Sequence, residues 1–489
     1  MRGPTNQIER KLNCVCERER EKEREREYFL RRRMVGTRSK KQRQEEARAK
    51  KTDDEAGINV DEGGGGGSAP LLGRGGAGGA SPRTVRVVIL GGGFAGRRCL
   101  RMLRAHRSPH VRVEPTLVDA KDFFEYTPST LRCMVEPSHA SFTTLPQPTG
   151  TVIGSAVGID EQRPGAASAV RLDNGQSLPC DYVLMCTGSS YISPVKPASV
   201  THSSLASRRQ ELQDASRTMQ DAVNILIVGG GFVGVELAAE IVGRYGKTKE
   251  VSLVSADDTL LPRMRPSVGQ YAEAWLERRG CKVFCGETIL EFGKLMANAS
   301  KLKRQTVQTD SGREFNADIV YMCAGFKPNT DVLQGDNKSK SRDERTGFAC
   351  VADTLRVVGY DNVFATGDCM LWNDEKNAMN ADVSATLACR NVIRLAEGAD
   401  ASVAGELLQY PQGVCYGRST VPLIAVLSLY KYHAVMQFNW LVVSGPLATL
   451  MKYVIEFLQI HTARENAFLS AVWNVCEHMS LLAARYVIT

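Results

Sequence analysis

Two short glycine-rich segments carry residue types that could bind the phosphates of a nucleotide. Each follows the pattern Gly-x-Gly-x-x-Gly: Gly91, Gly93 and Gly96, with Phe94 and Ala95 completing the loop, and then Gly229, Gly231 and Gly234. In such a loop the first glycine makes a tight turn, the second lets a pyrophosphate approach the backbone, and the third lets a helix pack close to a strand. The N-terminus of that helix faces the anion. We therefore predict two dinucleotide-binding loops.

An acidic residue at the end of the next strand would bind the ribose hydroxyls of the nucleotide. Asp119 takes this place after the first loop, and Ser255 takes the equivalent place after the second. A serine removes a repulsion against a 2′-phosphate, but no arginine follows directly, and Arg263 is only near in sequence. The pattern leaves both NADH and NADPH open as the second nucleotide.

A third segment, from Asn362 to Asp368, reads as a strand that ends in Thr-Gly-Asp. It has no counterpart after the second loop. We expect it to return the chain to the first nucleotide-binding unit and to place Asp368 against the sugar-alcohol chain of a flavin. Together with Asp119 and the first glycine loop, it makes the first site an FAD site.

The elements that must hold these residues occur twice. The strand-like segments Val85–Leu90 and Asn224–Val228 precede the two loops, and two later segments end in Thr187-Gly188 and Ala324-Gly325. Nearly the same offset in the sequence separates Gly91 from Gly229, Gly188 from Gly325, and Asp119 from Ser255. One shared spacing indicates two successive copies of one dinucleotide-binding unit. It adds three residues to the predicted cofactor-binding set: Thr187, Gly188 and Gly325.

Charge and cysteine usage narrow the function classes. Residues 1–50 hold 17 Lys and Arg against 9 Glu, which accounts for the whole formal charge of +8, so we expect no specific nucleic-acid binding. The 14 cysteines are scattered, several of them inside apolar runs, which is typical of reduced thiols in an intracellular protein. The longest apolar stretch, Trp440–Met451, is too short to span a bilayer. We assign no metal site.

Three stretches resemble flavoproteins with two dinucleotide-binding domains. Thr116–Pro128, which contains Asp119 and Lys121, and Gly234–Glu240 are similar to type II NADH dehydrogenases and apoptosis-inducing-factor-like proteins. Leu423–Trp473 resembles the ferroptosis-suppressor subgroup. The resemblance implies an NAD domain inserted in an FAD domain, adds Lys121 to the cofactor-binding residues, and implies hydride transfer from NAD(P)H to FAD, followed by electron transfer to a quinone or another small acceptor.

We therefore predict an α/β fold class with two Rossmann-like domains and a C-terminal α+β segment. The boundaries are a disordered charged and Gly-rich tail at 1–80, the FAD-binding domain at 81–215 and 331–400, the NAD(P)H-binding domain at 216–330, and an interface or quinone-side segment at 401–489. In the tail, Glu17–Glu27 alternates Glu and Arg without an apolar face, and Gly63–Gly67 begins a flexible linker.

The resemblance also implies roles for individual side chains. Glu236, at the start of the helix after Gly234, would orient the nicotinamide or line the flavin, although a Glu that complements the helix dipole would look the same. Lys376 would lie near the flavin or the quinone mouth, unless it is an exposed surface lysine. The C-terminal residues that would approach the flavin and quinone, or else form an apolar helical face, are Arg464, Phe468 and Trp473.

The chain departs from the family pattern in two places. Disulfide reductases carry Cys-x-x-x-x-Cys after the first glycine motif, whereas Cys99 is followed by no cysteine before Cys133. We therefore predict no redox-active disulfide. The myristoylation signal of the ferroptosis-suppressor subgroup also fails, because Arg2 stands where glycine is required.

The leading hypothesis is an FAD-dependent NAD(P)H:quinone oxidoreductase. The alternatives are an apoptosis-inducing-factor-like signalling flavoprotein with slow turnover and a reductase of a small iron–sulfur protein. A helical apolar stripe within Phe468–Leu482 would either dock as core or touch a membrane surface, helped by the basic cluster Arg31–Arg33. We expect an intracellular location, in the cytoplasm or the mitochondrion, and leave a peripheral membrane contact and a homodimer open.

Overall fold

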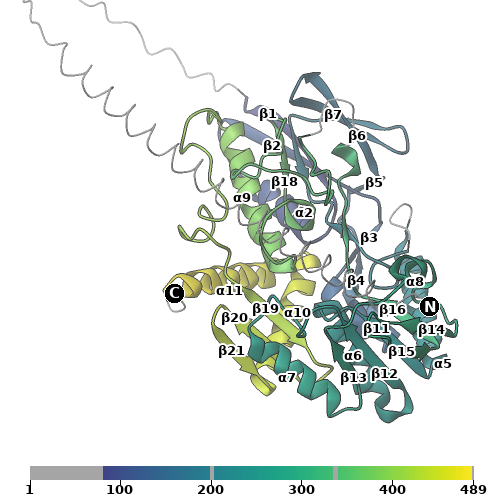
Figure 1. Ribbon diagram of the computed structural model, residues 1–489. Helices are drawn as coiled ribbons and strands as arrows, with labels where there is room; N and C mark the ends of the chain where they lie inside the picture. The colour runs from purple at the N-terminus through teal and green to yellow at the C-terminus, as the bar shows by residue number, and fades with distance from the viewer. Residues whose placement is uncertain (1–80, 199–202, 334–339, 487–489) are drawn as a thin grey trace, which may run out of the picture. The chain divides into compact units, whose positions relative to one another are not determined.

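A computed structural model describes residues 81–198, 203–333 and 340–486 (Figure 1). The predicted tail, with Glu17–Glu27, Arg31–Arg33 and Gly63–Gly67, lies outside the described residues. The first unit is built on a parallel sheet of five strands in the order β18-β9-β1-β2-β5. Its strands are β1 (Arg83–Leu90), β2 (Val111–Asp119), β5 (Val152–Ile153), β9 (Tyr182–Met185) and β18 (Val363–Ala365).

Two helices, α2 (Phe94–Ala105) and α9 (Ala378–Ala396), pack against each other in this unit. The last four residues of β1 are all buried, as expected for a strand in the middle of a covered parallel sheet. The return strand β18 pairs with β9, so residues 363–365 complete the first sheet as predicted. A separate antiparallel sheet connects β5 to β9: β6 (Ala156–Arg163), β7 (Ala166–Leu172) and β8 (Ser177–Pro179).

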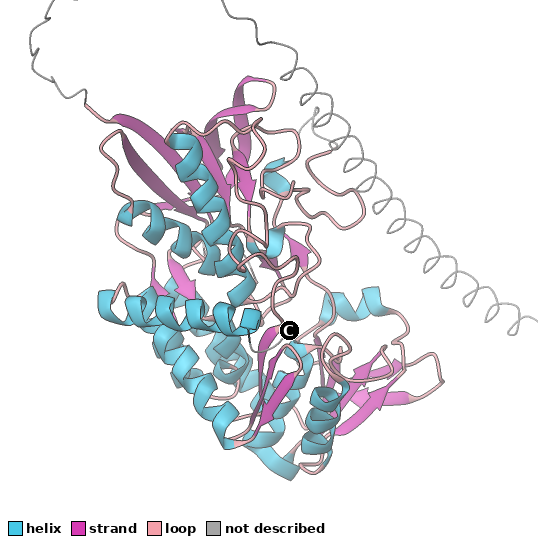
Figure 2. Cartoon of the chain, turned by 90° about the vertical axis from the view of Figure 1, so that its left-hand side faces the viewer, coloured by secondary structure: helices cyan, strands magenta, loops and turns pink. Residues whose placement is uncertain are grey.

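The second unit repeats the plan with a parallel sheet in the order β13-β12-β11-β16. Its strands are β11 (Asn224–Val228), β12 (Glu250–Ser255), β13 (Lys282–Cys285) and β16 (Ile319–Met322), and its helices are α6 (Phe232–Tyr245), α7 (Pro266–Glu277) and α8 (Phe292–Asn298), with a hairpin of β14 (Gln305–Gln308) and β15 (Glu314–Ala317). In Figure 2 the strands of the two units form separate groups, at the top and at the lower right.

The internal repeat is visible in the strand register. Leu90 pairs with Val118 and Met185, and the equivalent Val228 pairs with Val254 and Met322. The chain leaves the first unit through β10 (Ser189–Ser190) and returns through β17 (Lys327–Pro328), and these two short strands pair with each other. The second unit is therefore inserted in the first, which confirms the predicted fold class.

Short elements join the two units. They are β3 (Phe123–Glu125), β4 (Thr144–Pro146), α3 (Thr130–Cys133), α4 (Ala140–Thr143) and the longer α5 (Leu205–Asp221). Helix α5 is anchored by Arg208, which is fully buried and forms ion pairs with Glu125 at 2.9 Å and Glu211 at 2.8 Å. Because two carboxylates pair with it, this buried guanidinium is stable and links helix α5 to strand β3.

The C-terminal segment bridges both units. It contains an antiparallel sheet of β19 (Ile424–Ser428), β20 (Ala434–Phe438) and β21 (Leu441–Ser444), followed by α10 (Pro446–Ala463) and α11 (Ala467–Tyr486). Leu427 and Val435 share a core with α6, whereas Leu481 joins the core of the first unit. Within the described part of the chain, no helix is long and apolar enough to cross a bilayer.

Candidate functional site

The first glycine loop has the backbone geometry that a pyrophosphate requires. Gly91 has φ +102°, and a Cβ on it would lie 2.4 Å from the carbonyl oxygen of Cys186. A Cβ on Gly96 would lie 1.7 Å from the carbonyl oxygen of Gly91, so only glycine allows α2 to start here. In contrast, a Cβ on Gly93 would meet nothing within 4 Å, and no side chain caps the N-terminus of α2. The backbone N–H groups of this terminus are therefore available to an anion.

The Asp119 carboxylate is fixed beside this loop. Its Oδ2 accepts hydrogen bonds from the Gly92 N–H at 2.6 Å and from Gln147 Nε2 at 3.0 Å. Its Oδ1 accepts the Lys121 N–H at 2.9 Å, and the Lys121 ammonium lies 3.7 Å away. Gln147 has no motif around it, and sequence analysis missed it.

The Thr-Gly-Asp segment meets the first loop, as predicted. A Cβ on Gly367 would lie 3.7 Å from the Cβ of Ala95. The Ser189 hydroxyl donates a hydrogen bond to Asp368 Oδ2 at 2.8 Å, and the Lys196 ammonium donates to the same hydroxyl at 2.8 Å. The ring of Phe94 packs edge-on against Phe124. Loop, carboxylates and return strand thus converge, and these residues fit the pyrophosphate, ribose and sugar-alcohol parts of FAD.

The second glycine loop has the same geometry. Gly229 has φ +121°, a Cβ on Gly234 would lie 1.9 Å from the Gly229 carbonyl oxygen, and a Cβ on Gly231 would meet nothing within 4 Å. A Cβ on Gly230 would lie 2.5 Å from Ser255 Oγ, as one on Gly92 would lie 2.8 Å from Asp119 Oδ2. Ser255 is therefore the spatial counterpart of Asp119, as their spacing in the sequence suggests.

Three further predicted residues lie on the turns beside the loops. Gly188 and Gly325 have φ +65° and +78°, and neither would bring a Cβ within 4 Å of another residue. The hydroxyl of Thr187 donates to the carbonyl oxygen of Asn329, and the Asn329 amide donates back to the Thr187 carbonyl at 2.9 Å. This pair links the exit and return crossings of the chain.

Glu236 is held by the C-terminal segment. It is half-buried on α6, and its Oε1 accepts the backbone N–H of Ser428 at 2.7 Å. Burial raises the pKa of Glu236 to about 7, against the effects of the Ser428 hydrogen bond and of Lys452. A carboxyl with this pKa exchanges its proton near neutral pH.

Four more ionisable residues surround Glu236, and together the five are called the junction cluster here: Arg132, Glu236, Glu240, Lys452 and Glu456. Arg132 pairs with Glu240 at 3.3 Å, and both are buried. Lys452 donates to Ser428 Oγ at 2.8 Å and to the Tyr430 carbonyl at 2.9 Å. Sequence analysis missed Lys452 and Glu456, because an oppositely charged pair one turn apart on a helix usually faces solvent.

The other predicted side chains do not converge on Glu236. Lys376 donates hydrogen bonds to Asp374 Oδ1 at 2.8 Å and to the carbonyl of Met370 at 3.1 Å, so it stabilises the loop on which it lies. The Arg464 guanidinium lies over the ring of Phe142, and Phe468 is 74% exposed. Trp473 is buried. The functional roles predicted for these residues stay predictions.

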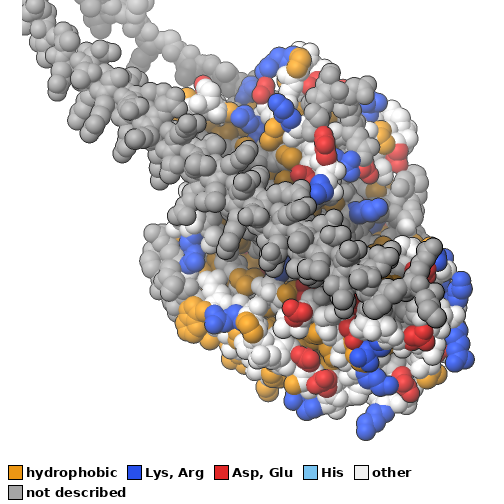
Figure 3. Space-filling model, in the orientation of Figure 1, with side chains coloured by type: hydrophobic (Ala, Val, Ile, Leu, Met, Phe, Trp, Pro, Cys, Tyr) orange, Lys and Arg blue, Asp and Glu red, His pale blue; other side chains and the backbone are white. Residues whose placement is uncertain are grey.

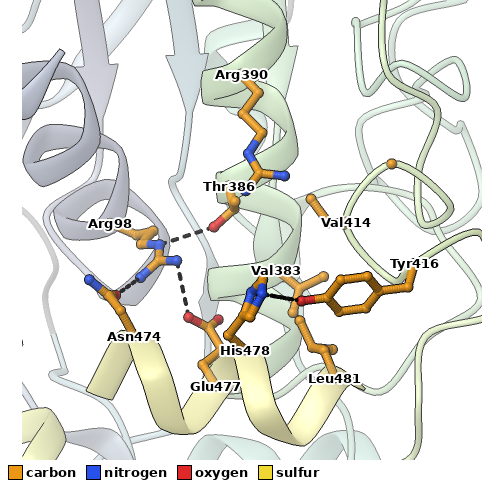
Figure 4. Close-up of a pocket in the computed structure, with 11 residues that line it drawn as sticks. Arg98, Val383, Thr386, Arg390, Val414, Tyr416, Asn474, Glu477, His478 and Leu481 are labelled. Carbon is orange, nitrogen blue, oxygen red and sulfur yellow. Dashed lines mark hydrogen bonds and ion pairs between the residues drawn. The ribbon is translucent and has the colours of Figure 1, made fainter. Parts of the chain in front are cut away.

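A separate cavity of about 130 Å³ lies between α2, α9 and α11 (Figure 4). Arg98 crosses it, with hydrogen bonds to Thr386 at 3.0 Å and Asn474 at 2.5 Å and an ion pair with Glu477 at 3.0 Å. Burial, together with the negative charge of Asp382, raises the pKa of Glu477 to about 7. These contacts dock α11 on the first unit.

The family model for pyridine nucleotide-disulphide oxidoreductases matches residues 85–399. The chain belongs to this family. Its members are flavin-dependent NAD(P)H oxidoreductases, and they bind FAD and NAD(P)H. The predicted kinship with two-domain flavoproteins is therefore confirmed.

Two relatives indicate which members of the family the chain resembles. The chain is 33% identical to human ferroptosis suppressor protein 1 over 314 residues, which cover 63% of this chain and 80% of that protein. It is 26% identical to apoptosis-inducing factor homolog B of Dictyostelium discoideum, over 72% of this chain and 97% of that protein.

Solved structures share the fold at low sequence identity. NDH2 from Plasmodium falciparum, solved with NADH, has a TM-score of 0.57 at 12% identity and covers 83% of this chain and 99% of its own. The sulfide:quinone oxidoreductase of Aquifex aeolicus has a TM-score of 0.59 at 13% identity and covers 83% of this chain and 96% of its own.

Proposed function

We propose that the protein is an FAD-dependent NAD(P)H:quinone oxidoreductase. The observation that carries this proposal is the place of Glu236: it lies on α6 just beyond the second glycine loop and is held by the Ser428 N–H of the C-terminal segment, in a chain whose first loop fits FAD. The chemistry that the cofactor supplies is hydride acceptance from NAD(P)H and two-electron transfer to a quinone. A quinone acceptor agrees with the shared fold of the sulfide:quinone oxidoreductase.

The chain's own residues divide the work. Gly91, Gly93 and Gly96 would bind the FAD pyrophosphate, and Asp119 and Asp368 its hydroxyl groups. The second glycine loop would bind the NAD(P)H pyrophosphate. Ser255 would contact the ribose, and Gly325 would lie on the turn beside the glycine loop. Glu236 would orient the nicotinamide or line the flavin.

The cysteines take no part in this proposal. Cys99 Sγ lies 3.8 Å from Cys186 Sγ, a pairing that the sequence spacing did not suggest. However, the hydrogen bond with Cys99 and burial raise the pKa of Cys186 well above its usual value, and both thiols are buried. Buried thiols without thiolate character are poor partners for disulfide exchange.

The quinone-side surface would lie on the C-terminal helices and touch a membrane. One face of α10 exposes apolar side chains at helical spacing: Leu447, Leu450, Met451, Val454 and Phe457, each 37–59% exposed. On α11, Phe468, Val475 and Met479 are 57–74% exposed. In Figure 3 hydrophobic side chains gather at the lower left, where β20 and β21 lie in Figure 1. Exposed apolar faces of this extent mark interaction surfaces, including lipid.

Stopped-flow kinetics test the oxidoreductase proposal. The purified protein, loaded with FAD, is reduced with NADH or NADPH and then mixed with a ubiquinone analogue, ferredoxin or oxygen. We expect fast reoxidation by the quinone and slow reoxidation by the other two. Asp368→Ala should lower flavin occupancy, whereas Glu236→Ala should keep the flavin and slow its reduction. Equal loss of flavin in both variants would contradict this division of roles.

The similarity to apoptosis-inducing factor homolog B, which covers 97% of that protein, favours a second candidate. This candidate is a redox-switched signalling flavoprotein with slow turnover. The same stopped-flow traces separate the two functions, because a switch requires a long-lived complex of reduced flavin with NAD⁺, whereas an oxidoreductase is reoxidised by quinone at its turnover rate. Ferredoxin-dependent reoxidation would instead indicate a reductase of an iron–sulfur protein.

A further inference from the structure

The junction cluster is assembled from three distant parts of the chain. Glu236 and Glu240 come from α6 in the second unit, Arg132 from α3 in the first unit, and Lys452 and Glu456 from α10 in the C-terminal segment. Close packing holds α6 against the C-terminal segment. A Cβ on Gly243 of α6 would lie 2.2 Å from the ring of Tyr430, in the turn that Lys452 binds.

The junction cluster contains more carboxyls than cations, so one carboxyl, that of Glu236, has no cation of its own. Three carboxyls face two cations, and Arg132 is committed to Glu240 at 3.3 Å and to the Tyr430 carbonyl at 3.3 Å. Although burial opposes it, hydrogen bonds from His139 at 2.9 Å and Ser129 at 2.6 Å lower the pKa of Glu456, which is therefore ionised. Glu236 accepts the backbone N–H of Ser428, and the Lys452 ammonium binds a hydroxyl and a carbonyl rather than a carboxylate.

Lys452 affects the Glu236 carboxyl in two ways. Its ammonium binds Ser428 Oγ and the Tyr430 carbonyl, and so fixes the turn whose Ser428 N–H holds the Glu236 carboxylate. Its positive charge also favours the ionised form of Glu236. Burial and the charge of Arg132 lower the pKa of Lys452 to about 8, so it remains mostly charged at pH 7. Other ionisable groups around the cluster are Tyr126, His139, the Glu136–Lys431 pair, and Tyr453, whose hydroxyl accepts a hydrogen bond from Arg132 and whose ring centroid lies 5.0 Å from the Lys452 ammonium.

We propose that Lys452 is a positioning residue for Glu236: it holds the Ser428–Tyr430 turn against the carboxylate and supplies the charge that lets Glu236 release and regain a proton during turnover. This proposal rests on the proposed function. Reduction of a quinone to a quinol takes up two electrons and two protons, and NAD(P)H brings two electrons with one proton as hydride. The second proton comes from solvent, and Glu236 is the group that relays it.

The test measures the ionisation of Glu236 directly, in the FAD-loaded full chain. Glutamate is labelled with ¹³C at Cδ, and the resonance that Glu236→Gln removes is followed by NMR from pH 5 to 9. Lys452→Gln keeps hydrogen-bond donors and removes the charge. It should raise the midpoint by about one unit, a tenfold change in the ionisation constant, and Lys452→Arg should restore it. Lys249→Met is the control, because the Lys249 ammonium also donates two hydrogen bonds, both to backbone carbonyls, in the second unit away from the cluster.

The pH profile of quinone reduction is the second readout. Its alkaline limb should move upward with the NMR midpoint in Lys452→Gln and stay in place in Lys249→Met. An unchanged midpoint in Lys452→Gln overturns the positioning role, whatever the activity. A shifted midpoint in a protein that reduces no quinone supports the positioning role and rejects the proposed function, so the two failures are distinguishable.

Discussion

Arg263 is paired with Glu375, with 2.5 Å between Arg263 Nε and Glu375 Oε1. The arginine follows β12 in the second unit, and the glutamate lies beside Lys376 in the first. The one arginine that the sequence offered as a partner for a 2′-phosphate is thus engaged elsewhere. Two exposed carboxylates, Asp257 and Asp258, follow Ser255 instead. These charges repel a phosphate on the ribose.

We therefore predict that NADH is preferred over NADPH. The kcat/KM value for NADH should exceed that for NADPH by about fivefold or more, since one unfavourable charge contact near the surface costs about 1 kcal/mol or more. Replacing Asp257 and Asp258 together by Asn should lower the ratio of these two values, because it raises the kcat/KM value for NADPH. Glu250→Gln is the control, because this exposed carboxylate lies at the opposite end of β12. Equal use of both nucleotides by the wild type would contradict the prediction.

The first glycine loop should not tolerate a side chain where α2 begins. A Cβ on Gly96 would lie 1.7 Å from the Gly91 carbonyl oxygen, so Gly96→Ala must displace the loop or the helix. We expect at least a tenfold loss of flavin occupancy, measured from the absorbance of the purified protein; a loop that moves by about 1 Å no longer presents its N–H groups to a pyrophosphate. Gly293→Ala is the control, because this exposed helical glycine has open space around it and alanine should stabilise α8 slightly.

Thiol alkylation should leave turnover unchanged. Among the described cysteines only Cys476 is exposed, and Cys99 and Cys186 are buried. Iodoacetamide should therefore label Cys476 first, and mass spectrometry of wild type and Cys476→Ser would show this. The activity should be unaffected even when the protein is first reduced with NADH. Inactivation only after such reduction would reveal a working dithiol, and Cys99 with Cys186 would be the pair to examine.

The docking of α11 should weaken as pH rises. Because the folded-state pKa of Glu477 is raised to about 7, the folded protein holds a proton that the unfolded chain releases near pH 4.5. The stabilisation is fully present below about pH 4.5 and is lost as pH approaches and passes about 7. Hydrogen exchange of α11 should thus be faster at pH 8 than at pH 6 after correction for intrinsic rates. Glu477→Gln should reduce this dependence and leave the part due to Asp382, whose pKa burial also raises, whereas Glu465→Gln, with an exposed side chain, should keep it.

The sequence predicts the parts of this fold that depend on local backbone requirements. Gly91 and Gly229 are recognisable because their positive φ values favour glycine, and Asp119 because the end of a parallel strand adjoins the loop. The return strand was also predictable, since Thr366-Gly367-Asp368 follows a short apolar run.

The junction cluster could not be predicted in the same way. Lys452 lies far from Glu236 in the sequence and meets it only through the packing of α10 and β19. Gln147, which binds Asp119, stands in a loop with no pattern of its own. The Cys99–Cys186 contact likewise arises from the packing of α2 against the end of β9. Such contacts depend on tertiary packing, which leaves no local periodicity in the sequence.

The last prediction concerns the apolar face of the C-terminal helices. Truncation after Glu465 would be a poor test, because it also removes the buried residues Trp473 and Glu477. A single charge introduced on the exposed face is a more specific test. The two substitutions are Val454→Glu on α10 and Phe468→Glu on α11. Inserting one such side chain into lipid contributes about 1.5–3 kcal/mol, so each substitution should weaken liposome binding about tenfold or more.

Quinone chain length gives this last prediction a functional readout. Both variants should lose activity with a long-chain quinone presented in liposomes and keep it with a short-chain, water-soluble analogue. Val157→Glu is the matched control, because Val157 is 52% exposed on β6, outside the C-terminal segment. If both variants bind liposomes as the wild type does, the exposed face is not the membrane contact. If they also lose flavin, the helices serve the core and access to the quinone lies elsewhere.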